Sequence, residues 1–258
     1  MNLLLLDASE VSSAGEVHLT GRRAEHLRTI LGVQVGQQLR AGLVGGELGQ
    51  VIVTEVGTGG VGVVFSGGKA PPPVPAVDLV LALPRPQTLK KVLQSAAALG
   101  VGSITLFRSA KVEKSFFSSP LLLPAALQAE LLLGLEQAGD TRLPRVHIVP
   151  RFRPLVEELL PQQMRDAGMG LVGHPRVEED LWSVGLTQHG GRVVVVVGPE
   201  GGFTEFELGA LTEVGCRPFS LGDRILRVET AVVVTLAQIQ LLRGRDRHDP
   251  QPSGHHSP

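Results

Sequence analysis

The segment 198–203 has the residue types of a ligand-binding turn. It follows five consecutive valines and reads Gly-Pro-Glu-Gly-Gly-Phe. Glycine has no β-carbon, so a ligand can approach the backbone closely at Gly198, Gly201 and Gly202. The segment is not a phosphate loop, because it lacks the Gly-Lys-Ser/Thr ending and because Glu200 would repel a phosphate. A carboxylate among free N–H groups instead suits a ligand with hydroxyls, an adenine edge or a cation. A plain strand-to-helix turn with a surface glutamate is the alternative interpretation.

A second segment, 220–231, crowds charged residues between apolar ones. Arg224, Arg227 and Glu229 lie within six residues, directly before an apolar stretch. Charges in such a place are more typical of a binding site than of a solvated surface. Ligands on open α/β sheets bind beyond the carboxyl ends of the strands, and each of the two segments follows an expected strand. S-adenosylmethionine offers the hydroxyls, the adenine edge and the cation that the first segment would suit.

The elements that must position these segments alternate between strand and helix patterns. The expected strands are 79–83, 103–107, 146–149, 169–173, 193–197 and 217–221, and the expected helices are 88–100, 124–138, 154–160, 204–214 and 229–242. Thr204 and Glu207 have the spacing of a capping box at the start of one helix. Continuous apolar strands separated by helices indicate a mainly parallel sheet that is covered on both faces.

A proline-rich run at 71–76 separates this region from a mostly β N-terminal part. Strands are expected at 16–19, 39–44, 51–56 and 61–65, with one helix at 21–31, which together fit a small β-barrel. Residues 57–62 match G-x-G-x-x-G, but a strand rather than a helix follows, so we expect a hairpin turn there. The predicted domains are 1–70 and 77–245, followed by a disordered tail at 246–258 that is rich in Pro, Gly and Ser.

Composition narrows the class of protein. The 258 residues are 43% hydrophobic, enough for one large core or two smaller ones. Cys216 is the single cysteine, so an internal disulfide and a cysteine-based zinc site are excluded, and the histidines lack metal-ligand spacing. We therefore expect no metal. No apolar stretch approaches the roughly 20 residues that span a bilayer, and the N-terminus does not have the pattern of a signal peptide. A cytoplasmic protein without a membrane partner is expected.

The formal net charge of −1 does not indicate a nucleic-acid binder, but the charge is uneven. Residues 71–150 carry a net charge of +3, and residues 85–114 contain six basic residues against one acid, Glu113. Such a cluster can contact phosphates even on a nearly neutral protein. On charge alone, an ordinary solvated surface is the favoured interpretation.

The two C-terminal motifs, GPEGGF-T-E-F-E-L and LG-D-R-ILR-V-ETA, resemble those of the RsmE-type family of 16S rRNA (uracil-N3)-methyltransferases in the SPOUT superfamily. The resemblance covers most of the chain, because residues 26–39, 98–104 and 134–146 also match typical stretches of that family. The two motifs are specific when they occur together in this order.

The resemblance implies an α/β fold class: a SPOUT-type domain with a deep trefoil knot and a mainly parallel sheet, preceded by a PUA-like β-barrel that helps to bind RNA. Periodicity could not reveal the knot, and general topology rules argue against one. It further implies a homodimer that binds S-adenosylmethionine and acts on 16S rRNA of the small ribosomal subunit. The implied cofactor-binding residues are Val172, Gly173, His174, Gly198, Pro199, Glu200, Gly201, Gly202, Leu221, Gly222, Ile225, Leu226 and Arg227.

Roles in catalysis follow from the chemistry of uracil, whose N3 must lose a proton before it attacks a methyl carbon. Arg227 is the candidate for stabilising the resulting anion, and Glu200 is a candidate base that we favour as a cofactor anchor. A paired base would have to be flipped out to reach the site. The expected RNA contacts are Arg22, Arg23, Arg28, Arg85, Lys90, Lys91, Lys111, Lys114 and Arg142.

Several positions depart from the family pattern. Gly32 replaces an arginine, Ser95 and Ala98 stand where the central helix has a lysine and a glutamate, and Asp140 stands where an arginine is common. An early arginine is missing as well. These changes remove polar or basic groups from the expected RNA side, while both cofactor segments are intact. The alternatives are a non-catalytic RNA-binding or ribosome-assembly relative, and a methyltransferase of the same fold with a different RNA target.

Overall fold

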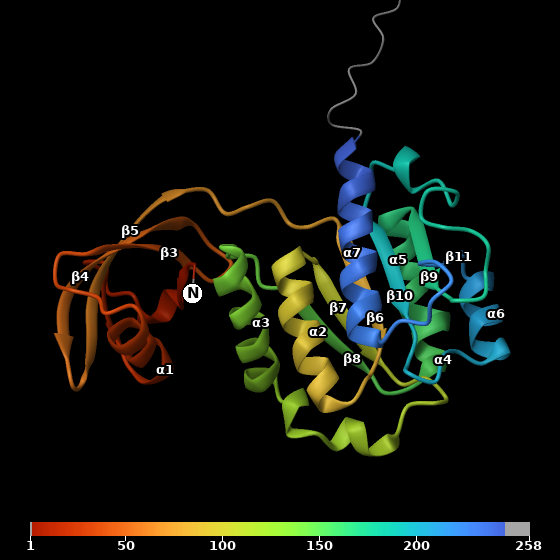
Figure 1. The fold of residues 1–258 in the computed structure, drawn as a ribbon, viewed down its shortest axis with the longest axis horizontal. Helices are drawn as coiled ribbons and strands as arrows, with labels where there is room; N and C mark the ends of the chain where they lie inside the picture. The colour runs from red at the N-terminus through yellow and green to blue at the C-terminus, as the bar shows by residue number, and fades with distance from the viewer. Residues whose placement is uncertain (1, 246–258) are drawn as a thin grey trace, which may run out of the picture. The chain divides into compact units, whose positions relative to one another are not determined.

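The computed structural model describes residues 2–245, which form two compact units (Figure 1). The first unit contains residues 2–74 together with 128–143, and the second contains residues 75–127 together with 144–245. The sequence pattern had assigned 128–143 to the C-terminal domain. The tail expected at 246–258 lies outside the described residues.

The first unit is built on one curled sheet with strand order β1-β3-β4-β5-β2. Its strands are β1 Leu4–Leu6, β2 Glu16–Leu19, β3 Gln38–Leu43, β4 Leu48–Gly57 and β5 Gly60–Lys69. A helical segment follows β2, as α1 Gly21–Glu25 and a π-helical turn His26–Ile30, and a short 3-10 turn spans Ala8–Glu10. Aliphatic side chains such as Leu6, Leu19 and Val61 are completely buried inside this sheet. The predicted β-rich unit with one helix is therefore confirmed, although β1 was not predicted.

Residues 57–62 form a hairpin turn rather than a dinucleotide-binding loop. Gly57 pairs with Gly60 at the end of the antiparallel β4–β5 ladder. Gly60 has φ +156 and lies close to the backbone of Leu19, so a side chain would not fit there. The hairpin interpretation of this glycine-rich run is confirmed.

Segment 128–143 completes the first unit through buried polar contacts. Glu136 is 4% exposed, accepts two hydrogen bonds from the Arg22 guanidinium at 2.8 and 3.1 Å, and its backbone oxygen accepts from the N–H of Leu3. The Thr141 hydroxyl donates to Gly46 O at 2.7 Å. A β-carbon at Gly42 would lie 2.5 Å from the Thr141 methyl group, so this contact requires glycine at position 42. These contacts explain why 128–143 belongs with the N-terminal strands.

The second unit has a six-stranded sheet in the order β11-β9-β10-β6-β7-β8, and all of its neighbouring strands pair in parallel. The strands are β6 Val77–Ala82, β7 Ser103–Phe107, β8 Arg145–Val149, β9 Met169–Gly173, β10 Val193–Val197 and β11 Cys216–Phe219. Every residue of β6, β7 and β10 is buried, as expected for central strands with both faces covered. The predicted parallel α/β sheet is confirmed.

Helices connect these strands at the predicted places, with some differences in length. They are α2 Pro86–Leu99, α3 Pro124–Ala138, α4 Phe152–Pro154, α5 Leu160–Ala167, α6 Glu205–Glu213 and α7 Val228–Arg245, with shorter helical turns at Lys114–Ser118, Pro120–Leu122, Leu155–Leu159 and Leu186–Gln188. Helices α2 and α7 pack against each other, in front of the sheet in Figure 1. The helical run after β8 extends from 152 to 167, further than the expected 154–160. Within residues 2–245, no helix is long and apolar enough to cross a membrane.

A buried ionic cluster fixes the amino ends of the central strands. The carboxylate of Asp78 accepts two 2.9 Å hydrogen bonds from Arg192 and one 2.7 Å bond from the Ser103 hydroxyl. Asp78 is 6% exposed, so its charge depends on these donors for stabilisation. The cluster joins β6 to β7 and to the residue that precedes β10.

We predict that Asp78→Ala lowers the free energy of unfolding by about 3 kcal/mol, because it leaves a largely buried guanidinium without its partner. Denaturant unfolding followed by circular dichroism measures the change. The control is Glu157→Ala, which removes the exposed pair with Arg153 and is expected to cost less than about 0.5 kcal/mol. Equal small effects of both substitutions would contradict a stabilising role for the cluster.

Candidate active site

Three neighbouring strands deliver the predicted cofactor residues to one edge of the sheet. Strands β11, β9 and β10 are adjacent and parallel, so their carboxyl ends Phe219, Gly173 and Val197 lie side by side. The N–H of His174 donates to Phe219 O at 2.9 Å, which ties two of the ends together. Val172, Gly173 and His174 therefore adjoin the start of both predicted loops, 198–202 and 221–227.

The loop after β10 is a tight turn shaped by its glycines. The N–H of Gly202 donates to Pro199 O at 2.8 Å, and Gly202 has φ +68, a conformation that favours glycine. A β-carbon at Gly198 would lie 2.9 Å from the Phe203 ring, so that position is restricted by packing. Phe203 is itself stacked against Phe107, with ring centroids 6.5 Å apart. Glu200 and Gly201 remain exposed at the tip.

Loops after β6 and β7 hold this turn in place. Lys111 Nζ donates to Gly201 O at 2.8 Å, and the N–H of Arg85, the residue before α2, lies 3.5 Å from Glu200 Oε1. The Glu200 carboxylate thus lies at the amino end of a 14-residue helix, where the helix dipole stabilises a negative charge. This placement suits an anchoring role for Glu200. Of the two residues expected to contact RNA here, Lys111 uses its side-chain ammonium group for this contact, whereas Arg85 contributes only its backbone N–H.

Glu207 is a structural residue of the site that the sequence revealed only in part. It is 2% exposed and forms the predicted capping box, accepting from the N–H of Thr204 at 3.0 Å. Its other carboxylate oxygen accepts from the N–H of Ala110 at 2.7 Å, which joins α6 to the loop after β7. The capping pattern identified the first bond, but no local pattern could identify the second.

The loop after β11 leads directly into α7. The Ser220 N–H donates to Glu179 O at 2.7 Å, and Gly222 has φ +108. Arg227 is exposed just before α7, and within residues 2–245 its guanidinium has neither a hydrogen bond nor an ion pair. Glu229, in the first turn of α7, lies 3.6 Å from Lys91 Nζ on α2. The structure thus leaves Arg227 available for a ligand and gives Lys91 an internal partner.

The surroundings of His174 disfavour the charged form of its imidazole. Burial lowers the pKa of this imidazole below its ordinary value, and the nearby charge of Arg176 lowers it further. The N–H of Arg176 donates to His174 Nδ1 at 3.3 Å, which fixes Nδ1 as an acceptor. Both effects favour an uncharged imidazole in the wall of the site that β9 contributes.

The remaining residues expected to contact RNA fall into two groups. In the first unit, Arg23 pairs with Glu10, Arg28 donates to Gly57 O at 2.9 Å, and Arg142 donates to Pro72 O at 2.5 Å. Together with Arg22, these guanidinium groups serve the fold of their own unit. In the second unit, Lys90 and Lys114 are exposed, on α2 and at the start of a 3-10 turn.

We predict that Glu207→Gln lowers the free energy of unfolding by about 2 kcal/mol, because the new amide cannot accept hydrogen bonds from Thr204 and Ala110 on both of its ends. Hydrogen exchange at the Ala110 N–H should accelerate, and exchange followed by mass spectrometry measures it. Glu205→Gln, in the same helical turn but exposed, is the matched control. If both variants exchange at the same rate, Glu207 does not join the two loops.

The sequence of this chain is similar to those of known methyltransferases. Residues 70–240 match the model of the RNA methyltransferase domain family. The ribosomal RNA small subunit methyltransferase E of Mycobacterium bovis is 28% identical over 229 residues, which cover 87% of this chain and 86% of that protein.

Solved structures share the fold. The ribosomal RNA small subunit methyltransferase E from Neisseria gonorrhoeae, bound to S-adenosyl methionine, superposes with a TM-score of 0.75 at 24% identity, covering 94% of this chain and 98% of that chain. A putative methyltransferase from Legionella pneumophila, in complex with SAM, gives a TM-score of 0.76 at 21% identity over 93% of this chain and 97% of that chain. Because the family model spans residues 70–240 and so includes all three loops of the site, the chain belongs to the RNA methyltransferase domain family.

Proposed function

We propose that the chain transfers a methyl group from S-adenosylmethionine to N3 of a uridine in 16S rRNA of the small ribosomal subunit. The observation that carries the proposal is the meeting of three loops at the carboxyl ends of β9, β10 and β11. Two of these loops contain the paired motifs, and the family match extends over all of them. The ribosomal RNA specificity is supported by the names of the relatives.

The residues present fit this cofactor. Nothing lies within 4 Å of the place where a β-carbon would stand at Gly202 or Gly222, so the backbone of both loops is open to a ligand. The lowered pKa of His174 favours a neutral imidazole beside these loops, which suits a cationic ligand. Residues 172–174, 198–202 and 221–227 would hold S-adenosylmethionine. When bound, it supplies a methyl group that is activated by a sulfonium ion.

Arg227 is the residue that we assign to the reacting base. Its exposed guanidinium follows the loop that begins at Leu221, and it lies at the amino end of α7. A fixed positive charge there would stabilise the uracil anion that forms when N3 loses its proton. The Glu200 carboxylate lies at the amino end of α2 and orients the loop 198–202, so we do not assign Glu200 as the base.

A homodimer is part of the proposal, as is the deep knot that the family resemblance implies. Helix α7 exposes apolar side chains at a spacing of four residues, at Val233, Ala237 and Leu241, and Leu241 is 60% exposed. Residues at this spacing lie on one face of a helix. Such a stripe supports association with a second copy through α7, close to the loop that carries Arg227.

We predict that the purified chain, incubated with labelled S-adenosylmethionine and small ribosomal subunits from a strain lacking this gene, produces 3-methyluridine. Nucleoside mass spectrometry of the 16S rRNA identifies the product and its position. Label on another nucleotide would contradict the N3 assignment. Cofactor binding by calorimetry without any labelled RNA would favour a non-catalytic relative instead.

Arg227→Ala is the control variant for this assay. We expect about a hundredfold loss of kcat, since one charged donor to a developing anion is removed. Arg227→Lys keeps the positive charge but lacks the planar guanidinium group with its paired N–H donors. It should therefore recover part of the rate. An unchanged rate in Arg227→Ala would show that Arg227 has no part in catalysis.

We predict that Leu241→Glu converts a dimer to a monomer, because it places a charge in the proposed α7 interface. Light scattering coupled to size exclusion measures the mass. Leu123→Glu introduces the same change at a side chain that is 62% exposed before α3, and it should leave the mass unchanged. A monomeric wild-type chain would overturn the dimer.

A further inference from the structure

A row of aromatic rings runs from the core of the second unit to its surface. Four of the chain's eight phenylalanines take part in this aromatic row, namely Phe203, Phe107, Phe152 and Phe206. Phe107 stacks on Phe203 with 6.5 Å between the ring centroids, and its centroid lies 6.1 Å from that of Phe152. The Phe152 ring in turn lies 6.4 Å from the ring of Phe206. These separations are typical of aromatic pairs that attract each other, so each ring supports the next.

The exposure of the rings increases toward one end of the aromatic row. Phe107 is completely buried, Phe203 is 9% exposed and Phe206 is 77% exposed. Phe152, which contacts both Phe107 and Phe206, is partly buried. The Phe206 ring therefore contributes little to the hydrophobic core, although Phe152 supports it on one side. A supported aromatic ring that is open to solvent can receive a second flat ring.

The exposed end of the aromatic row lies at the same edge of the sheet as the cofactor loops. Phe107 is the last residue of β7, and Phe152 begins α4 shortly after β8 (Figure 1). Phe206 directly precedes Glu207, whose carboxylate accepts from the N–H of Ala110 in the loop after β7. The segment that begins with the cofactor loop after β10 thus ends over β7 and β8, where it presents the Phe206 ring.

The chain around this exposed end is basic. Segment 108–114 has three basic residues and one acid, Glu113, and segment 145–153 has three basic residues and no acid. A 3.3 Å hydrogen bond from the N–H of Arg108 to the last residue of β8 holds the two segments side by side. Within residues 2–245, neither the Arg108 nor the Arg151 guanidinium has a hydrogen bond or an ion pair. Both are therefore available for an anion.

The two acids next to Phe206 in the sequence leave its ring accessible. Glu205 is exposed, but side chains at adjacent positions of a helix do not face each other. Glu207 is 2% exposed, and its carboxylate is bound to the N–H groups of Thr204 and Ala110. The surface at Phe206 thus combines an apolar ring with nearby positive charge.

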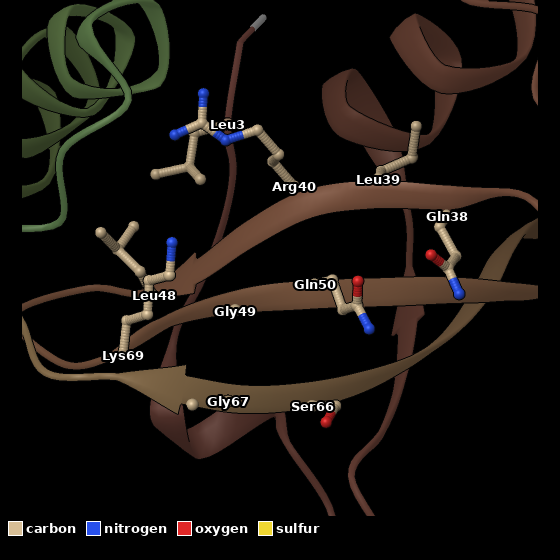
Figure 2. A pocket seen from close by; sticks show the side chains of 11 residues that line it. Leu3, Gln38, Leu39, Arg40, Leu48, Gly49, Gln50, Ser66, Gly67 and Lys69 are labelled. Atoms are coloured by element: carbon tan, nitrogen blue, oxygen red, sulfur yellow. The ribbon is translucent and has the colours of Figure 1, made fainter.

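A hollow of the first unit lacks this combination. It has a volume of about 620 Å³, lies over β3, β4 and β5, and is lined by polar side chains such as Arg40, Gln50 and Ser66 (Figure 2). Among the described residues that line it, none is aromatic, so a base would find no ring to stack on. The Glu47 carboxylate also fills the place where a β-carbon at Gly67 would stand, which adds a negative charge at one end.

We propose that Phe206, supported by Phe152, stacks on an unpaired nucleotide that flanks the methylated uridine, and that Arg108 and Arg151 bind the phosphates beside it. This assignment rests on the proposed function. An enzyme that turns its target base out of the stack must offset the lost stacking energy. An exposed ring near the site offsets part of it, because every base has a flat face that stacks on such a ring. Phe206 therefore positions the RNA without selecting a particular neighbouring base.

The experiment compares Phe206→Ala with the wild-type full chain in RNA-binding titrations. The probes are an oligouridine of about ten nucleotides and the same strand paired with its complement. We expect Phe206→Ala to bind the single strand about tenfold more weakly, which is an ordinary loss for one stacked base. Binding of the duplex should not change, since its bases are paired and stacked on one another. Phe206→Trp keeps an aromatic face and should bind both probes like the wild-type chain.

Leu123→Ala is the matched control, because it shortens an apolar side chain that is 62% exposed in the same unit. It should bind both probes like the wild-type chain. Equal losses in Phe206→Ala and Leu123→Ala would overturn the proposal, and so would equal losses on the single strand and the duplex. If Phe206→Ala changes the mass in light scattering and leaves RNA binding unaltered, Phe206 belongs to a protein–protein contact instead.

The double variant Arg108→Gln/Arg151→Gln tests the phosphate contacts. It should weaken the binding of both probes. For the single strand, the slope of log K against log salt should shrink by about 1.4, since each phosphate contact contributes about 0.7. An unchanged slope would overturn the proposed role of the two arginines.

Methylation separates this proposal from the proposed function. With small ribosomal subunits as substrate, Phe206→Ala should raise KM about tenfold. The Kd for S-adenosylmethionine, measured by calorimetry, should stay at the wild-type value, since Phe206 lies outside segments 198–202 and 221–227. Wild-type methylation with an unaffected variant would reject the stacking role and leave the enzyme standing. Single-strand binding that depends on Phe206, without any methyl transfer by the wild type, would reject the enzyme and leave the stacking role standing.

Discussion

Parallel pairing of the six strands in the second unit is the constraint on which the site depends. It places every carboxyl end at one edge of the sheet, and the order β11-β9-β10-β6-β7 places five of their loops in succession there. The three loops of the cofactor site follow β9, β10 and β11. The two loops after β6 and β7 supply the groups that hold them, through Arg85, Ala110 and Lys111. The parallel arrangement of the strands therefore accounts both for the cofactor site and for the loops that hold it in place.

Much of this arrangement could be predicted from local sequence. Runs such as the five valines of β10 identify central strands. The glycines that follow such runs identify loops whose backbone a ligand can approach closely. Strand β1 escaped prediction because three leucines are too few to show a period, and its parallel partner β3 lies more than 30 residues away. The hydrogen bond between Glu207 and the N–H of Ala110 could not be predicted for a similar reason, because the two residues are 97 positions apart in the sequence.

The basic residues show where charge counting fails. The sequence shows where an arginine stands in the chain. It does not show which carboxylate or carbonyl group the guanidinium binds after folding. Arg22 and Arg28 were expected to contact RNA, yet they are bound to Glu136 and to the loop at Gly57. Gly32, which replaces an arginine of the family, has φ +56, so its backbone conformation favours glycine. The availability of a charge is a property of the fold, and it must be judged residue by residue.

The division of the first unit between two stretches of chain also has a consequence for its folding during synthesis. The chain passes between the units at 74/75, 127/128 and 143/144. Glu136 and Thr141 of the later stretch form hydrogen bonds with Arg22 and Gly46, so the first unit lacks these contacts until residue 143 has left the ribosome. By then β6 and β7 of the second unit have already been made. The aliphatic core of the amino-terminal strands, from Leu4 to Val63, contains no residue of the later stretch, so this core can form first and the polar contacts with 128–143 are added after β6 and β7 have been made.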